Sequence, residues 1–270
     1  MGLSLNHIVN SSTTLERLLK RDRAIVVSGI ILVSVLAWFY LFSLAHDMQS
    51  MRMDVALDQP LMKPWGLVEF SLTFVMWAVM MVGMMLPSAA PMILLFATVN
   101  RKRSERGKPF VATAVFALAY ITVWAGFSLF ATSAQWVLQS KALLSQQMAS
   151  TSPVLGGVVL LGAGVFQWTS LKRMCLTHCR TPLDFLMFEW RDGEWGAFLM
   201  GLRHGVFCLG CCWVLMALLF VTGVMNLLWV AIIAAVVLIE KAAPSGLWIG
   251  RVAGLLLIAW GVWMVAEALI

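Results

Sequence analysis

Long apolar stretches separated by short polar segments dominate the chain. A membrane-spanning helix needs about 20 mostly apolar residues, and the pattern gives seven candidate spans. They lie at residues 24–45, 67–97, 109–134, 153–172, 196–222, 227–241 and 248–270. Because backbone polar groups cannot stay unpaired in hydrocarbon, each span should be a helix. We therefore predict an all-α polytopic membrane protein, with residues 1–23 as an N-terminal segment and residues 24–270 as one bundle of about seven helices.

The composition agrees with this class. The chain of 270 residues is 61% hydrophobic and 12% charged, with a mean hydropathy of +0.89, which is typical of a polytopic membrane protein. Glycine-rich phosphate loops, nucleophile elbows and paired catalytic carboxylates on a soluble domain are not visible in the sequence. The composition therefore argues against the common soluble enzyme classes.

The distribution of basic residues predicts the orientation. With the N-terminus inside, 16 of the 19 lysines and arginines face the cytoplasm, and only Arg52, Lys63 and Lys141 face outward. The positive-inside rule favours this arrangement, and seven spans then place the C-terminus outside. Anionic lipid is a sufficient partner for the net charge of +6, so we expect the bilayer and no nucleic acid as a binding partner.

Soft metal ligands lie in a row on the fifth span. Read as a helix, residues 200–216 stack one histidine, two cysteines and two methionines at successive i, i+4 steps, with a third cysteine beside them. In chain order these residues are Met200, His204, Cys208, Cys211, Cys212 and Met216. Thiols, imidazole and thioethers suit Cu(I) or Zn(II). The alternative is that the cysteines only pack as small buried hydrophobes.

A second group, Cys175, His178 and Cys179, follows the fourth span. If the helix continues there, the two cysteines are i, i+4 neighbours at the cytoplasmic surface. His204 and Cys208 enter the membrane from the same side, so we predict that the two groups meet at the inner face. The alternative is a pair of exposed thiols in a reducing compartment.

The second span carries a methionine ladder, Met76, Met80 and Met84, and a second one formed by Met81 and Met85. Thioethers bind Cu(I) weakly and exchange it readily, although methionine is also a common gap filler in packed interiors. Pro87 and Pro91 predict a bend or break in this span. Among the charges in apolar stretches, Glu240 is a candidate ligand, since a carboxylate at membrane depth is costly unless it has a role or a partner.

The first outer loop offers imidazole, thioether and carboxylate groups within nine residues. These are His46, Met48, Met51, Met53 and Asp54. We predict an outer capture site for a soft cation here, with an interfacial helix whose methionines enter the lipid as the alternative.

Several runs of the sequence resemble a bacterial family of predicted metal-binding integral membrane proteins, formerly labelled a domain of unknown function. The runs are Phe166–Lys172, Cys175–Pro182, Trp190–Gly193, Met200–Gly201, His204–Gly205, Cys208–Trp213 and Glu240–Lys241, with Met84–Pro87 also similar. The likeness covers most of the chain from about residue 65 onward. It implies metal binding and a multi-pass protein of the bacterial inner (cytoplasmic) membrane.

We therefore expect a membrane protein that binds a soft metal, copper first and zinc second, for transport, handling or delivery to a cuproprotein. An ion caught outside would pass the methionines of the second span and the thiols of the fifth, and leave near Cys175 and Cys179. A metallochaperone or a membrane cuproprotein complex is the expected partner. The alternatives are a transmembrane thiol–disulfide carrier using Cys208 and Cys211, a metal-dependent oxidoreductase using His204, Glu240 and Glu69, and a structural subunit.

Overall fold

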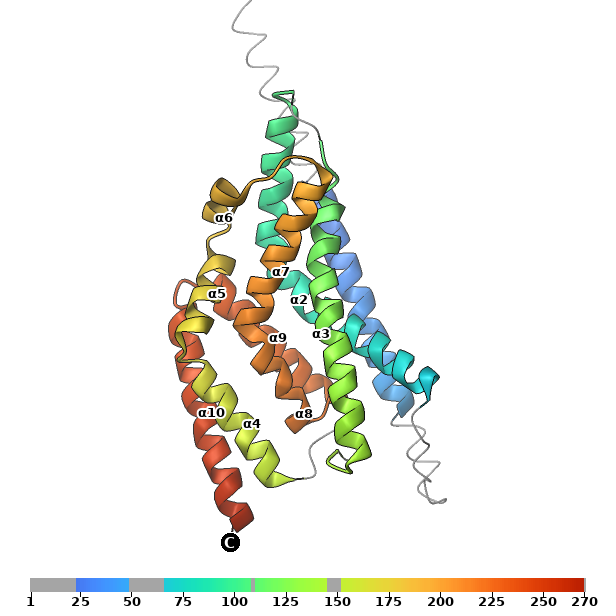
Figure 1. The fold of residues 1–270 in the computed structure, drawn as a ribbon, viewed down its shortest axis with the longest axis vertical. Helices are drawn as coiled ribbons and strands as arrows, with labels where there is room; N and C mark the ends of the chain where they lie inside the picture. The colour runs from blue at the N-terminus through green and yellow to red at the C-terminus, as the bar shows by residue number, and fades with distance from the viewer. Residues whose placement is uncertain (1–22, 49–65, 108–109, 145–151, 270) are drawn as a thin grey trace, which may run out of the picture.

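The computed structural model describes residues 23–48, 66–107, 110–144 and 152–269, and within these ranges the regular elements are helices, with no strand. The all-α prediction is therefore confirmed for the described part of the chain. A first helix spans Arg23–Met48. The others are α2 (Leu67–Ser104), α3 (Thr113–Ser140), α4 (Pro153–Phe166), α5 (Ser170–Arg180), α6 (Pro182–Glu189), α7 (Gly193–Ala217), α8 (Leu219–Thr222), α9 (Leu227–Ala242) and α10 (Gly246–Leu269) (Figure 1).

Five of the described helices are long and apolar enough to cross a membrane. They are Arg23–Met48, α2, α3, the segment Gly193–Thr222 and α10, and the count becomes six if α4 and α5 form one span. These two helices meet at a bend of 62°. The remaining candidate of the seven predicted spans is α9, which has 16 residues and is shorter than a straight crossing requires.

A capping residue of its own starts α5 at the bend between α4 and α5. Ser152 accepts a hydrogen bond from the backbone of Leu155 and starts α4, whereas Thr169 accepts one from the backbone of Lys172 and starts α5. A capping hydroxyl satisfies a backbone N–H that would otherwise lack a partner at the start of a helix. Because α5 has its own cap, its register begins afresh at Thr169 and places Lys172, Cys175 and Cys179 at i, i+3, i+7 spacing on one side.

The two prolines bend α2 without ending it. The helix continues as one element from Leu67 to Ser104 with Pro87 and Pro91 inside it, and its cyan first part and blue-green last part run in different directions (Figure 1). Just before Pro87, the backbone oxygen of Met85 accepts hydrogen bonds from the Tyr120 hydroxyl at 3.0 Å and the Ser88 hydroxyl at 2.8 Å. The bend therefore lies where α2 meets α3.

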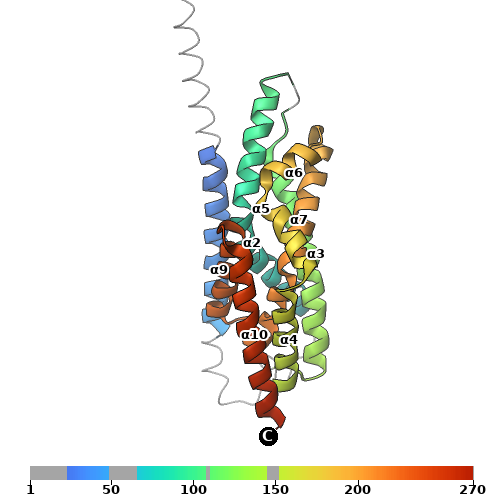
Figure 2. The ribbon, with the colours of Figure 1, turned by 90° about the vertical axis from the view of Figure 1, so that its left-hand side faces the viewer.

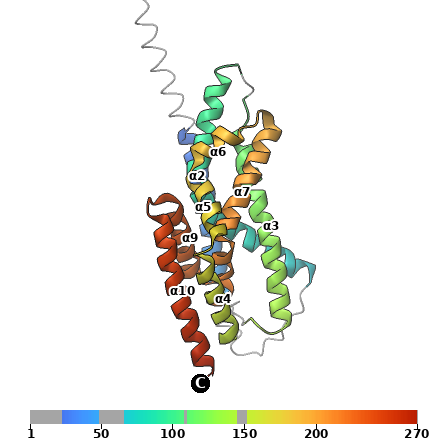
Figure 3. The same cartoon turned by 60° about the vertical axis from the view of Figure 1, so that its left-hand side comes forward.

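The helices α7 and α9 lie between two outer groups, with α4 and α10 on one side and α3 on the other (Figures 1 and 3). Figure 2 shows α4 and α10 side by side at the front of the molecule when it is viewed from their side. The largest fully buried aromatic side chains, among them Trp77, Trp124 and Tyr120, belong to α2 and α3. The interior is thus formed around α2, α3 and α7.

Glycines bring α4 and α10 into direct backbone contact. A Cβ added at Gly164 would lie 2.7 Å from the backbone oxygen of Gly254, and one at Gly157 would lie 3.0 Å from that of Gly261. Small residues at such positions let membrane helices approach closely and gain dispersion contacts. We expect Gly164→Ala to push the two helices apart and to lower the free energy of unfolding by about 1–3 kcal/mol, the usual cost of overpacking.

The measurement is thermal unfolding of the purified protein in detergent. Gly162→Ala is the matched control, because a Cβ at Gly162 meets nothing within 4 Å. Equal melting temperatures for the two variants would contradict the close helix contact.

Candidate metal centre

All five cysteines of the chain gather where α5 packs against α7. Each is a free thiol, and Cys175, Cys208, Cys211 and Cys212 are buried. The thiol of Cys179 lies close enough to those of Cys208 and Cys211 to interact with them. The thiols of the two predicted groups therefore lie together.

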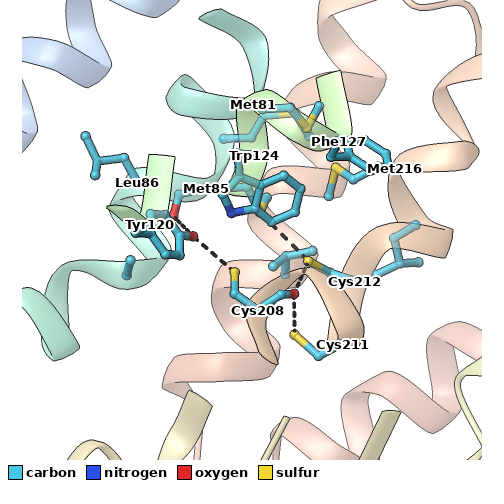
Figure 4. Close-up of a cluster of buried hydrophobic side chains, with 14 of the residues drawn as sticks. Met81, Met85, Leu86, Tyr120, Trp124, Phe127, Cys208, Cys211, Cys212 and Met216 are labelled. Carbon is cyan, nitrogen blue, oxygen red and sulfur yellow. Dashed lines mark hydrogen bonds between the residues drawn. The ribbon is translucent and has the colours of Figure 1, made fainter. Parts of the chain in front are cut away.

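Cys208 has the most polar surroundings of the five. Its sulfur lies 3.0 Å from the hydroxyl of Tyr120 on α3 and 2.9 Å from Nζ of Lys241 on α9 (Figure 4 shows the contact with Tyr120). Lys241 also donates to the hydroxyl of Ser88 on α2 at 3.0 Å. Polar groups of α3 and α9 thus contact the sulfur directly, and α2 contributes a hydroxyl that contacts it through Lys241.

The other two thiols of α7 bond to their own helix. Cys211 and Cys212 donate to the backbone oxygen of Cys208 at 3.0 and 2.9 Å, and Cys212 also lies 3.9 Å from the sulfur of Met85. Within the described ranges, no three side chains of the His, Cys, Asp and Glu types are placed so that they could hold one ion. Shared coordination therefore requires these thiols to rotate away from the carbonyl.

Gly210 makes room for the cysteines of α5. It lies between Cys208 and Cys211, and a Cβ added there would come within 2.8 Å of the sulfur of Cys175. Because Gly210 has no side chain, Cys175 can approach the backbone of α7 between Cys208 and Cys211.

If the thiols bind Cu(I), as the sequence predicts, Gly210→Ala should displace Cys175 and weaken that binding several-fold, while α7 itself gains helix propensity. The measurement is a competition titration with a chromophoric Cu(I) chelator. Gly126→Ala is the control, since a Cβ there meets nothing within 4 Å. Unchanged copper affinity in Gly210→Ala would show that the approach of Cys175 is not used in binding.

The two predicted histidines lie in different surroundings. His204 is buried among the rings of Tyr120, Phe116 and Phe185, with centroid distances of 5.6, 6.2 and 5.9 Å, and its Nδ1 has no hydrogen-bond partner in the described part of the chain. His178 stacks on Phe207 at 4.2 Å, and its Nδ1 lies 2.8 Å from the backbone oxygen of Met174. His204 is thus one turn from Cys208 on the buried face of α7, whereas His178 lies against an aromatic ring.

The methionines of α2 are buried, and the second ladder is the one beside the thiols. Met81 and Met85 point towards Trp124 and Phe127 of α3, and Met216 of α7 joins them (Figure 4). Met76, Met80 and Met84 are also buried on α2. Next to Met76 on α2, the indole N–H of Trp77 donates to the side-chain oxygen of Gln135 on α3 at 2.7 Å. The packed interior between α2 and α3 therefore contains polar groups as well as thioethers.

Glu240 is fully buried and pairs with a lysine rather than with the thiols. Its carboxylate lies 2.8 Å from Nζ of Lys172, which also donates to the side-chain oxygen of Gln167. Lys172 and Glu240 are each about 2% exposed. The sequence pattern marked Lys172 only as one of the basic residues on the inside. Its charge is opposite to that of Glu240 and lies at a similar depth, which could have predicted the ion pair.

The predicted outer capture site is described only in part. His46 is exposed and Met48 half-buried at the end of the first helix, while Met51, Met53 and Asp54 fall outside the described residues. Tyr120, Met85 and Lys241 are the contacts of the thiols that the sequence analysis did not single out as neighbours. They come from three other helices, so no spacing along the chain marks them.

Comparison with known proteins gives a family. A family model described as PpoB2, copper chaperone, matches residues 74–264, a range that includes α3 to α9 and most of α2 and α10. No curated protein and no solved structure matches the chain. The predicted resemblance is confirmed as far as it concerns a copper-related family. Since the match extends over most of the sequence and includes all five cysteines, the chain belongs to the PpoB2 copper chaperone family.

Proposed function

We propose that the protein binds Cu(I) at the buried thiols of α5 and α7 and delivers it to an acceptor protein. The observation that carries the proposal is the convergence of all five free cysteines from two helices, beside the thioether of Met85. Thiolate and thioether are the protein ligands that soft Cu(I) prefers. Sequence-distant thiols would have no reason to meet if each served only to fill its own helix face.

Binding of Cu(I) would change the protonation and the hydrogen bonds of the thiols. The thiolate is the form that ligates a metal, so each cysteine that binds gives up its proton. Cys211 and Cys212 must first release the Cys208 carbonyl to which they donate. A site whose ligands make weak bonds elsewhere in the free protein retains its ion less strongly than a preformed site, which suits delivery rather than storage.

The surroundings suggest the route of the ion. Met81, Met85 and Met216 lie on one side of the α7 thiols, and Cys175 and Cys179 lie on the other. In this proposal Cu(I) arrives along the thioethers, is held at Cys208 and its neighbours, and is released on the α5 side. His46 and Met48 remain candidate capture groups at the far end of the first helix.

The test is the metal content and ligand set of the purified full chain. Protein loaded with Cu(I) and passed through a desalting column should retain about one equivalent, and its X-ray absorption spectrum should show sulfur as the main scatterer. Absence of copper, or a ligand shell made mainly of nitrogen and oxygen, would contradict the proposal.

A thiol–disulfide carrier is the second candidate, because the thiol of Cys179 already lies beside those of Cys208 and Cys211. Thiol exchange requires such an approach of thiols. It would not require Met85 or copper. Two results would favour this alternative. Single Cys→Ser variants would trap mixed disulfides, and copper-free protein would still exchange thiols with disulfides.

A further inference from the structure

Lys241 is a half-buried cation whose polar partners are a thiol and a hydroxyl. Its Nζ lies 2.9 Å from the sulfur of Cys208 and 3.0 Å from the hydroxyl of Ser88. Among the described residues no carboxylate forms an ion pair with it, because the neighbouring Glu240 pairs with Lys172. A lysine at the end of an apolar helix that contacts a thiol and lacks a carboxylate partner is a candidate functional group.

Two ties hold Lys241 in this position. Glu240, the preceding residue, is anchored to Lys172 of α5. Just after Lys241, the guanidinium of Arg180 donates to the backbone oxygens of Ala243 and Pro244 at 2.7 Å each. Both ties join the end of α9 to α5, so the ammonium group is fixed relative to the thiols of both α5 and α7.

The ammonium group of Lys241 is therefore the charge beside the thiols that no other described side chain balances. Lys172 and Glu240 cancel each other, and the groups that face Lys241 from α2 and α3 are the neutral hydroxyls of Ser88 and Tyr120. A metal bound to Cys208 would lie about 2.3 Å from its sulfur. The metal and the ammonium group would then be separated by about 5 Å or less.

A fixed positive charge at this distance distinguishes between ions of different charge. For any given set of thiolates, the attraction between Lys241 and the ligands is the same whichever ion is bound. The repulsion between Lys241 and the ion is twice as large for Zn(II) as for Cu(I), because Coulomb energy scales with charge. The ammonium group therefore disfavours the divalent ion relative to the monovalent one, whatever the number of thiolates.

We propose that Lys241 is the specificity-determining residue of the site, which selects monovalent Cu(I) over divalent Zn(II) through the contact of its ammonium group with Cys208. This inference rests on the proposed function, since it assumes that the thiols bind copper. It adds that selection depends on charge as well as on the softness of sulfur, which also binds zinc well.

The experiment compares Cu(I) and Zn(II) affinities of the full chain in detergent. Each metal is titrated in competition with a chromophoric chelator, for the unchanged protein and for Lys241→Met, Lys241→Arg and Lys102→Met. Methionine keeps the length of the side chain without its charge, arginine keeps the charge, and Lys102 is an exposed cation near the end of α2. Lys241→Gln is a second neutral variant in case Lys241→Met is poorly folded.

In both neutral variants the ratio of Cu(I) to Zn(II) affinity should fall at least about fourfold, and by about a hundredfold or more if the effective dielectric constant of the site is near 20. Lys241→Arg and Lys102→Met should keep the ratio of the unchanged protein. A ratio that stays constant in the neutral variants, or falls equally in Lys102→Met, would overturn the inference. If the unchanged protein binds no Cu(I), or if Cys208→Ser binds it equally well, the proposed function itself fails.

Discussion

Replacement of Cys208 by serine is expected to weaken Cu(I) binding at least about a hundredfold. Loss of a group that only orients a ligand typically costs 10–100-fold in metal affinity, and Cys208 is the thiol around which the others are arranged. Tyr120, Lys241 and the carbonyl contacts of Cys211 and Cys212 all meet at this residue. Serine retains a hydrogen-bonding group of similar size but presents a hard oxygen in place of sulfur.

The measurement is the competition titration with a Cu(I) chelator, supported by the copper content after desalting. Val206→Ser is the matched control, because it introduces the same residue on an exposed part of α7. Cys179→Ser should give a smaller loss, since it removes one of the two thiols of α5 and leaves Cys175 and the three thiols of α7 in place. Copper affinity that is equal in Cys208→Ser and Val206→Ser would place the metal elsewhere.

The second large effect is expected on stability, at the ion pair of Lys172 and Glu240. Lys172→Met should lower the free energy of unfolding by about 3–5 kcal/mol, because it leaves the carboxylate of Glu240 buried without a counter-charge. Both side chains are almost inaccessible. The remaining neighbour, Gln167, offers a neutral amide whose Nε2 is buried without a hydrogen-bond partner among the described residues.

A double variant separates the charge effect from lost packing. Lys172→Met combined with Glu240→Gln removes both charges at once, and it should recover much of the stability lost in the single variant, since replacement of a buried pair by neutral groups is often nearly without cost. Unfolding by heat or denaturant in detergent gives both values, and Lys102→Met is the control for loss of an exposed lysine. Equal stabilities of the single and double variants would contradict a buried, charged pair.

The hydrophobic pattern predicted most of the helices but not how many cross a membrane. Long apolar runs such as 67–97 and 109–134 correspond to α2 and α3, since in hydrocarbon such a run would satisfy its backbone only as a helix. The run 153–172 does not form one straight span, since Ser152 and Thr169 each cap a separate helix. Whether the run forms one helix or two depends on the capping geometry. The hydropathy of the run does not predict that geometry.

For the site, i, i+4 spacing correctly placed Met200, His204, Cys208, Cys212 and Met216 on one buried face of α7, and Cys211 is buried as well. This follows from the sequence because helix periodicity is a local property. Spacing also grouped Met76, Met80 and Met84, but it could not tell which methionine ladder faces the thiols. That choice depends on how α2 is rotated against α7, and the contact of Met85 with Cys212 shows that the second ladder faces them.

The sequence by itself determined the residue types: a chain of apolar helices with thiols, thioethers and an imidazole at helical spacing, whose local order is set by the backbone alone. Tertiary structure decided which of these groups meet and which charges accompany them. Lys172 cancels Glu240, whereas Lys241, one residue further along α9, touches Cys208. Adjacent residues on a helix point about 100° apart, so only the packing of α5, α7 and α9 assigns one to an ion pair and the next to the thiols.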